Sequence, residues 1–169
     1  NLVDTPGHSD FSEDTYRVLS AVDSAIMLID ASKGMEAQTL RLFEVCAERD
    51  LPIMVLINKW DRPGLAPLEL LDELARITQR RPMPVTWPVG QSGDFRGLRD
   101  SVSGEMIVFE HDGSGAQLPR EHRLSADEAA AQFADDWETA VDEAELVALD
   151  GGPYDQEHFL DRTGMPVFF

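Results

Sequence analysis

The chain has 169 residues and a formal net charge of −18, from 32 acidic and 14 basic side chains. This length suffices for one domain with a real hydrophobic core. The acidic excess argues against a general nucleic-acid binder, so no DNA partner is expected. The single cysteine, Cys46, excludes an internal disulfide and suits a reducing cytoplasm. No apolar run reaches the length of a membrane span, so no membrane partner is expected either.

A first motif follows an apolar segment at the start of the chain. The segment Asn1–Val3 is predicted to be the end of a buried strand, and the motif comprises Asp4, Thr5, Pro6, Gly7 and His8. Proline and glycine favour a turn, and ligands bind at this edge of open α/β sheets. A carboxylate there can hold Mg²⁺ through water, and a glycine N–H can meet a phosphate oxygen. An imidazole can orient an attacking water.

A second motif follows another apolar run, Pro52–Ile57, which is predicted to be a buried strand. It comprises Asn58, Lys59, Trp60 and Asp61. The Asp61 carboxylate can accept from both the N1–H and the exocyclic amine of guanine, a pair of contacts that adenine cannot reproduce. The aliphatic stem of Lys59 can cover the face of the base, and Asn58 can hold neighbouring loops. A carboxylate left unpaired by the wrong base is costly, which gives discrimination.

Together, the two motifs resemble those of the translational GTPases. Five further segments are similar to the peptide chain release factor three family: 12–17, 21–24, 44–46, 49–50 and 84–90. Elongation factor G and the ribosomal protection proteins share the first motif and diverge in the helix after it. The chain departs from its relatives at Ser9, where many carry Glu, and at Trp60, where a smaller apolar residue is usual.

The resemblance implies a GTPase that binds GTP or GDP with Mg²⁺. The resemblance implies that Asp4 supports Mg²⁺ through a water molecule and that Gly7 senses the γ-phosphate. His8 would position the water that attacks this phosphate. Thr5 and Pro6 would also belong to the GTP site. Asn58, Lys59 and Asp61 would read guanine. Its partners would be the ribosome and class one release factors, which such a factor recycles with GTP at termination, in the cytoplasm.

A phosphate-binding loop of the form Gly-x-x-x-x-Gly-Lys-Ser/Thr is missing from the sequence. The only two lysines are Lys33 and Lys59, and neither lies in such a context. The resemblance places that loop upstream of the first motif. We therefore expect the chain to be an incomplete GTPase domain that is inactive when isolated.

The expected fold is α/β, a mostly parallel sheet of the P-loop GTPase type with flanking helices and an inserted α+β subdomain. In the first part, strands are expected over 24–29 and 52–57. Helices are expected over 11–22, 37–49 and from Pro67 through Ile77, with Leu42, Phe43, Cys46 and Ala47 facing inward in the second.

From Arg80 onward, the regular alternation of predicted strands and helices ends. We expect a break over 80–84, a strand over 85–89, a loop over 90–104, a short strand over 105–110 and a turn over 111–115. A capping box at Ser125 predicts a helix to about Leu149, followed by a short helix over 155–162 and a final strand. The predicted division is 1–79 for the GTPase core, 80–153 for the insertion and 154–169 for the return to the core. The acidic helical part covers 121–150.

Several alternatives stay open at this point. An elongation factor G-like or ribosomal protection GTPase is one alternative, and by itself the chain can also be a non-enzymatic folded module or interaction surface. The run 121–150 holds ten acids and one arginine, which suits a solvated helix face or an acidic docking surface. The histidines His111, His122 and His158 share no metal-ligand spacing.

Overall fold

The computed structural model describes residues 2–4, 13–110 and 120–169, and its strands form two four-stranded sheets. The first sheet is parallel throughout, in the order β1-β2-β8-β3. Its strands are β1 (Ala25–Asp30), β2 (Ile53–Asn58), β8 (Gly164–Phe168) and β3 (Arg81–Pro84). A parallel sheet with helical crossovers is the α/β architecture that the sequence predicts.

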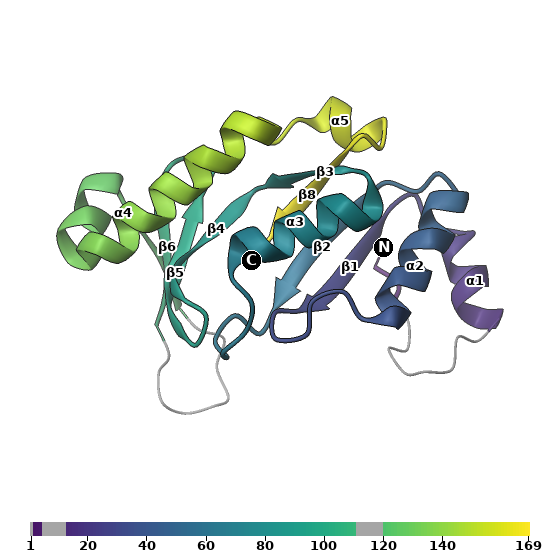
Figure 1. The fold of residues 1–169 in the computed structure, drawn as a ribbon, viewed down its shortest axis with the longest axis horizontal. Coiled ribbons are helices and arrows are strands. Elements are labelled where there is room, and N and C mark those ends of the chain that lie inside the picture. The colour runs from purple at the N-terminus through teal and green to yellow at the C-terminus, as the bar shows by residue number, and fades with distance from the viewer. Residues whose placement is uncertain (1, 5–12, 111–119) are drawn as a thin grey trace.

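Helix α1 (Glu13–Leu19) precedes β1, α2 (Ala37–Glu48) connects β1 to β2, and α3 (Pro67–Thr78) connects β2 to β3. The predictions of α2 and α3 are confirmed to within one residue at their ends, and α1 ends at Leu19, three residues before the predicted end. In Figure 1, α1 and α2 lie together on the side of β1. Leucines at helical spacing in α3 are buried, namely Leu70, Leu71 and Leu74. In α2 the prediction for Ala47 was wrong, because Ala47 is exposed and Val45 is buried.

Burial alternates along β2. Ile53, Val55 and Ile57 are buried on one face of the strand. The same alternation in β1 leaves Ile26 and Leu28 exposed, at 54% and 60%. The strands β1 and β2 run in full register, from Ala25 opposite Ile53 to Asp30 opposite Asn58. Their carboxyl ends therefore lie side by side.

The second sheet is antiparallel, in the order β4-β5-β6-β7. Its strands are β4 (Thr86–Gln91), β5 (Asp94–Asp100), β6 (Met106–Glu110) and β7 (Arg120–Leu124). The long helix α4 (Ala126–Gly151) packs against β4 and β3, and α5 (Gln156–Leu160) packs against β8 (Figure 1). The capping box at Ser125 and the short strand at 106–110 confirm two predictions.

Three predictions of secondary structure were wrong. The predicted break at 80–84 contains β3, because Arg81–Pro84 pairs in parallel with β8, a partner more than 80 residues away. The predicted loop at 90–104 contains β5, which forms a hairpin with β4 despite its charged residues. The segment 2–4 forms no strand, and Leu2 is 88% exposed, since nothing among the described residues pairs with it.

A chain of three aromatic rings joins the parallel sheet to the antiparallel one. Phe169 lies 5.3 Å from Trp60 in an edge-on contact and 5.5 Å from Trp87, measured between ring centroids. All three residues are buried, and Trp87 donates its indole N–H to Glu143 on α4 at 3.2 Å. Trp60, unusual for the resembled family, therefore has a packing role here.

Candidate functional site

The structure describes four of the eight predicted site residues. Asp4 is exposed and lies in the segment 2–4. The other residues of the first motif, Thr5, Pro6, Gly7 and His8, lie outside the described residues. The second motif, Asn58, Lys59, Trp60 and Asp61, is described completely.

The second motif begins at the last residue of β2. The side-chain oxygen of Asn58 accepts from the backbone N–H of Lys59 at 2.9 Å. Lys59 has a φ of 66°, which is left-handed and turns the chain sharply out of the strand. Trp60 is 4% exposed, whereas the side chains of Lys59 and Asp61 are 45% and 72% exposed. The buried tryptophan thus lies between two side chains that face solvent.

Asp30, the last residue of β1, contacts the second motif directly. Its Oδ2 lies 2.7 Å from the Nζ of Lys59, and this ion pair bridges the adjacent ends of β1 and β2. Its Oδ1 accepts from the backbone N–H and the hydroxyl of Ser32 at 2.9 and 2.6 Å. The ammonium of Lys59 and then the Ser32 contacts hold the pKa of the Asp30 carboxyl well below its usual range, so the carboxyl stays ionised.

The predicted strand over 24–29 ends one residue before Asp30, and the sequence indicated no role in the site for this residue. A signal was available, because an aspartate at a strand end followed two residues later by serine favours an Asx turn. The contact with Lys59 had no such signal, since it depends on the register of β1 and β2.

The loop after the motif is held on two sides. On one side, the backbone N–H of Leu65 donates to Ala31 O at 3.0 Å, and Gly64 lies so close that a Cβ there would be 2.6 Å from that same oxygen. On the other side, the β4–β5 turn donates to the loop. The Ser92 hydroxyl bonds Arg62 O at 2.7 Å, and the Gly93 N–H bonds Trp60 O at 3.3 Å. The motif is thus attached to both sheets.

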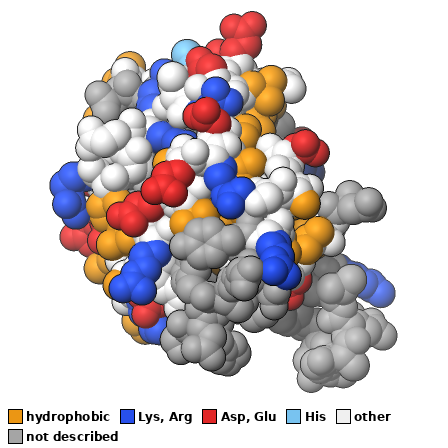
Figure 2. All heavy atoms as spheres, turned by 90° about the vertical axis from the view of Figure 1, so that its right-hand side faces the viewer, with side chains coloured by type: hydrophobic (Ala, Val, Ile, Leu, Met, Phe, Trp, Pro, Cys, Tyr) orange, Lys and Arg blue, Asp and Glu red, His pale blue; other side chains and the backbone are white. Residues whose placement is uncertain are grey.

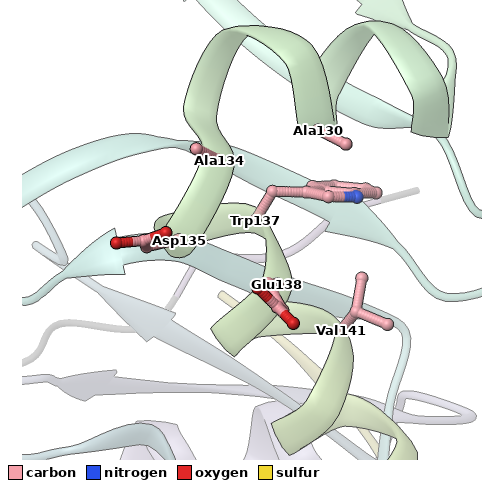
Figure 3. A pocket seen from close by; sticks show the side chains of 6 residues that line it. All are labelled: Ala130, Ala134, Asp135, Trp137, Glu138 and Val141. Carbon is pink, nitrogen blue, oxygen red and sulfur yellow. The ribbon is translucent and has the colours of Figure 1, made fainter.

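Two hollows open near α4. One, of about 390 Å³, lies between the start of α3, the β4–β5 turn and α4, and Trp60 borders it. The other, of about 370 Å³, is a notch in α4 itself, at Ala134, whose φ of 39° interrupts the helix. Figure 3 shows the Trp137 ring between Ala130 and Val141 in this notch. Neither hollow is bordered by Asn58, Lys59 or Asp61, whose side chains reach solvent instead.

The sequence matches the family described as the Elongation factor Tu GTP binding domain over residues 1–151, which includes both motifs. The chain belongs to this family. The finding supports the translational GTPases as its class, with GTP or GDP as the nucleotide and GTP hydrolysis as the activity of the family. The parallel sheet with its flanking helices fits the α/β fold of a GTPase of the Elongation factor Tu GTP binding domain family.

Two further properties bear on the site. Within 2–4, 13–110 and 120–169, no cluster of three or more His, Cys, Asp or Glu side chains could hold a metal ion. In the same part of the chain, every helix is too short or too polar to cross a membrane.

Proposed function

We propose that the end of β2 is the guanine-reading part of a GTP site in a translational GTPase. The observation that supports this most is the exposure of the Lys59 and Asp61 side chains beside the strand-end Asn58. Asp61 offers a carboxylate to the two N–H donors of guanine. Lys59 offers its aliphatic stem to the face of the base, and Asn58 fixes the start of the turn by accepting from the Lys59 N–H. Family membership supplies the nucleotide class.

The phosphate end of the site is assigned to the first motif by resemblance. Asp4 is exposed and its carboxylate is a suitable hard-oxygen ligand, so Asp4 would hold Mg²⁺ through water. The chemistry of that ion is neutralisation of phosphate charge. Gly7 would donate its N–H to the γ-phosphate, and His8 would orient the attacking water. Thr5 and Pro6 would shape the turn that places these two groups.

Within the translational GTPases, we propose a factor of the peptide chain release factor three type. The support is sequence similarity in the segments 12–17, 21–24, 44–46, 49–50 and 84–90. Such a factor binds the ribosome in the cytoplasm and uses GTP to recycle class one release factors. In a reconstituted termination reaction, GTP-dependent turnover of a class one factor is the expected result. Promotion of translocation in its place would contradict this assignment.

The guanine-reading role can be tested by a change of base preference. In a protein that contains this chain together with a phosphate-binding loop, Asp61→Asn replaces an acceptor with a potential donor. Xanthine presents a carbonyl where guanine presents its exocyclic amine, so the preference should shift from GTP toward XTP. Competition between the two nucleotides, measured by displacement of a fluorescent GDP analogue, gives the ratio of affinities.

Asp72→Asn is the matched control, because Asp72 is an exposed aspartate on α3. It should leave both affinities at the wild-type level. If Asp61→Asn kept wild-type GTP affinity and gained none for XTP, Asp61 would not be the guanine reader.

A further inference from the structure

The ion pair between Asp30 and Lys59 joins a strand end to the guanine-reading motif. The two side chains come from residues 29 positions apart, and their charged atoms lie 2.7 Å apart. The Asp30 side chain is 17% exposed and that of Lys59 is 45% exposed. The contact is therefore a partly exposed ion pair at the adjacent carboxyl ends of β1 and β2.

Asp30 is fixed independently of Lys59. Its Oδ1 accepts two hydrogen bonds from Ser32, and its backbone oxygen accepts from the N–H groups of Lys33 and Gly34 at 3.0 Å each. Its backbone lies opposite Asn58 in the sheet. The Asp30 carboxylate is thus an anchored acceptor, and only its second oxygen is directed to the lysine.

A lysine side chain whose ammonium has no partner does not hold its aliphatic stem in one conformation. Its four-carbon stem samples many rotamers, and ordering it on a ligand loses that freedom. The ion pair with Asp30 fixes the far end of the stem before any base arrives. Exposed ion pairs contribute little to folding stability. The main effect of this contact is therefore to restrict the conformations of the Lys59 side chain.

We propose that Asp30 is a positioning residue of the nucleotide site, which holds the Lys59 stem in place to cover the face of the base. The inference rests on the proposed guanine-reading role of the motif. Asp30 acts through Lys59 and needs no contact with the nucleotide. Ionisation of Asp30 over the physiological pH range keeps the ion pair formed, consistent with its lowered pKa.

The test is a double-mutant cycle on GDP binding, in a protein that contains this chain and a phosphate-binding loop. The variants are Asp30→Ala, Lys59→Met and the double variant, each measured for GDP affinity and GDP dissociation rate. Lys59→Met keeps an apolar stem and loses the ammonium. We expect Asp30→Ala to weaken GDP binding about tenfold, mid-range for two residues in direct contact. In the Lys59→Met background, Asp30→Ala should have no further effect.

The conservative variant Asp30→Asn keeps one oxygen, which can accept from Lys59 while the amide NH2 donates to the Ser32 hydroxyl, so only the Ser32 N–H loses its acceptor. It should lose less affinity than Asp30→Ala, while the melting temperatures of the two variants stay close to that of the wild type. It also keeps the test usable if Asp30→Ala folds poorly.

Asp100→Asn is the matched control. Asp100 lies 3.0 Å from Arg123, with side-chain exposures of 19% and 43%, and it too accepts from backbone N–H groups two and three residues further on. It reproduces the type of contact on the antiparallel sheet, away from the guanine motif. GDP affinity should not change in this variant.

The outcomes separate the inference from the proposed function. If Lys59→Met, which keeps the stem and loses only the ion pair, leaves GDP affinity unchanged, the ion pair does not position the stem and the inference alone is overturned. The proposed function is overturned separately, if Asp61→Asn keeps wild-type GTP affinity and gains none for XTP. If Lys59→Met weakens binding and Asp30→Ala does not, the inference alone is overturned. Equal losses from Asp30→Ala in both backgrounds also overturn it, because a purely structural role would not depend on the lysine.

Discussion

The burial of Trp60 leaves the neighbouring side chains of Lys59 and Asp61 on the solvent side. The tryptophan ring is buried and contacts Phe169 edge-on at 5.3 Å, which anchors the middle of the motif. Lys59, with its left-handed backbone, and Asp61 remain on the solvent side. The anchor restricts the motif before the nucleotide binds, and such restriction lowers the entropy lost on binding.

At the same scale, we predict that His8 acts in hydrolysis rather than in binding. Positioning of water acts on the transition state more than on ground-state affinity. In a protein that carries this chain and a phosphate loop, His8→Ala should leave GTP affinity within a few fold. Ribosome-stimulated hydrolysis should fall by roughly 10²-fold or more, the scale of an orienting side chain. Single-turnover hydrolysis on ribosomes, alongside nucleotide binding, measures both.

A residue that merely begins a helix would give the opposite pattern. Thermal stability would change slightly and turnover would not. Equal turnover in the two proteins would remove His8 from the mechanism, even if Asp61 reads guanine as proposed.

Among the elements, α4 is the longest, and its start is defined by a capping box. The N–H of Glu128 donates to the Ser125 hydroxyl at 3.3 Å, and the N–H of Ser125 donates to the Glu128 carboxylate at 2.8 Å. Loss of an N-cap side chain typically costs about 1 kcal/mol. Ser125→Ala should therefore lower the free energy of unfolding by about this amount, measured by urea denaturation. Ser125→Asn, which keeps a capping oxygen, is the control and should lose much less.

The capping box should also depend on pH. Hydrogen bonds from the Ser125 hydroxyl and backbone lower the pKa of the Glu128 carboxyl. A lowered folded-state pKa gives a stabilisation that is present above the unfolded pKa and is lost as the pH falls through the folded one. The difference between wild type and Ser125→Ala should accordingly shrink in acid. A difference that stays constant down to the lowest pH at which the protein remains folded would contradict this account.

Across the whole molecule, the charge is unevenly distributed. The helix α4 holds nine acids and no lysine or arginine, whereas the face on the side of α1 and α2 shows both signs close together, with hydrophobic side chains between them (Figure 2). Most carboxylates of α4 are exposed, so a solvated helix face accounts for its composition.

Nucleotide affinity is also a property of the whole molecule. The phosphate loop supplies much of the affinity in this class of enzyme, and the 169 residues contain no such sequence. We predict that a protein made of these residues alone binds GTP and GDP no more tightly than about millimolar, on the order of 4 kcal/mol. Isothermal titration calorimetry with Mg²⁺ present is the measurement. Micromolar binding would show that the base-reading motif supplies far more affinity than we expect.

The sequence by itself determined the elements whose signals are local. Leu70, Leu71 and Leu74 predicted the buried face of α3, the capping box at Ser125 predicted the start of α4, and the apolar run before Asn58 predicted β2. The candidate guanine-reading residues could be named for the same reason, since they directly follow a recognisable strand. Their roles stay predictions, as do those of the first motif.

Only the tertiary structure decided the features that depend on partners far away in the chain. Arg81–Pro84 contains two prolines and looks like a break, and it is a strand because β8 provides a neighbour. Trp60 is buried because Phe169 packs on it. Asp30 meets Lys59 because β1 and β2 are parallel and in register, which places their ends side by side. Strand pairing and packing are non-local, so a local pattern has no means to encode them.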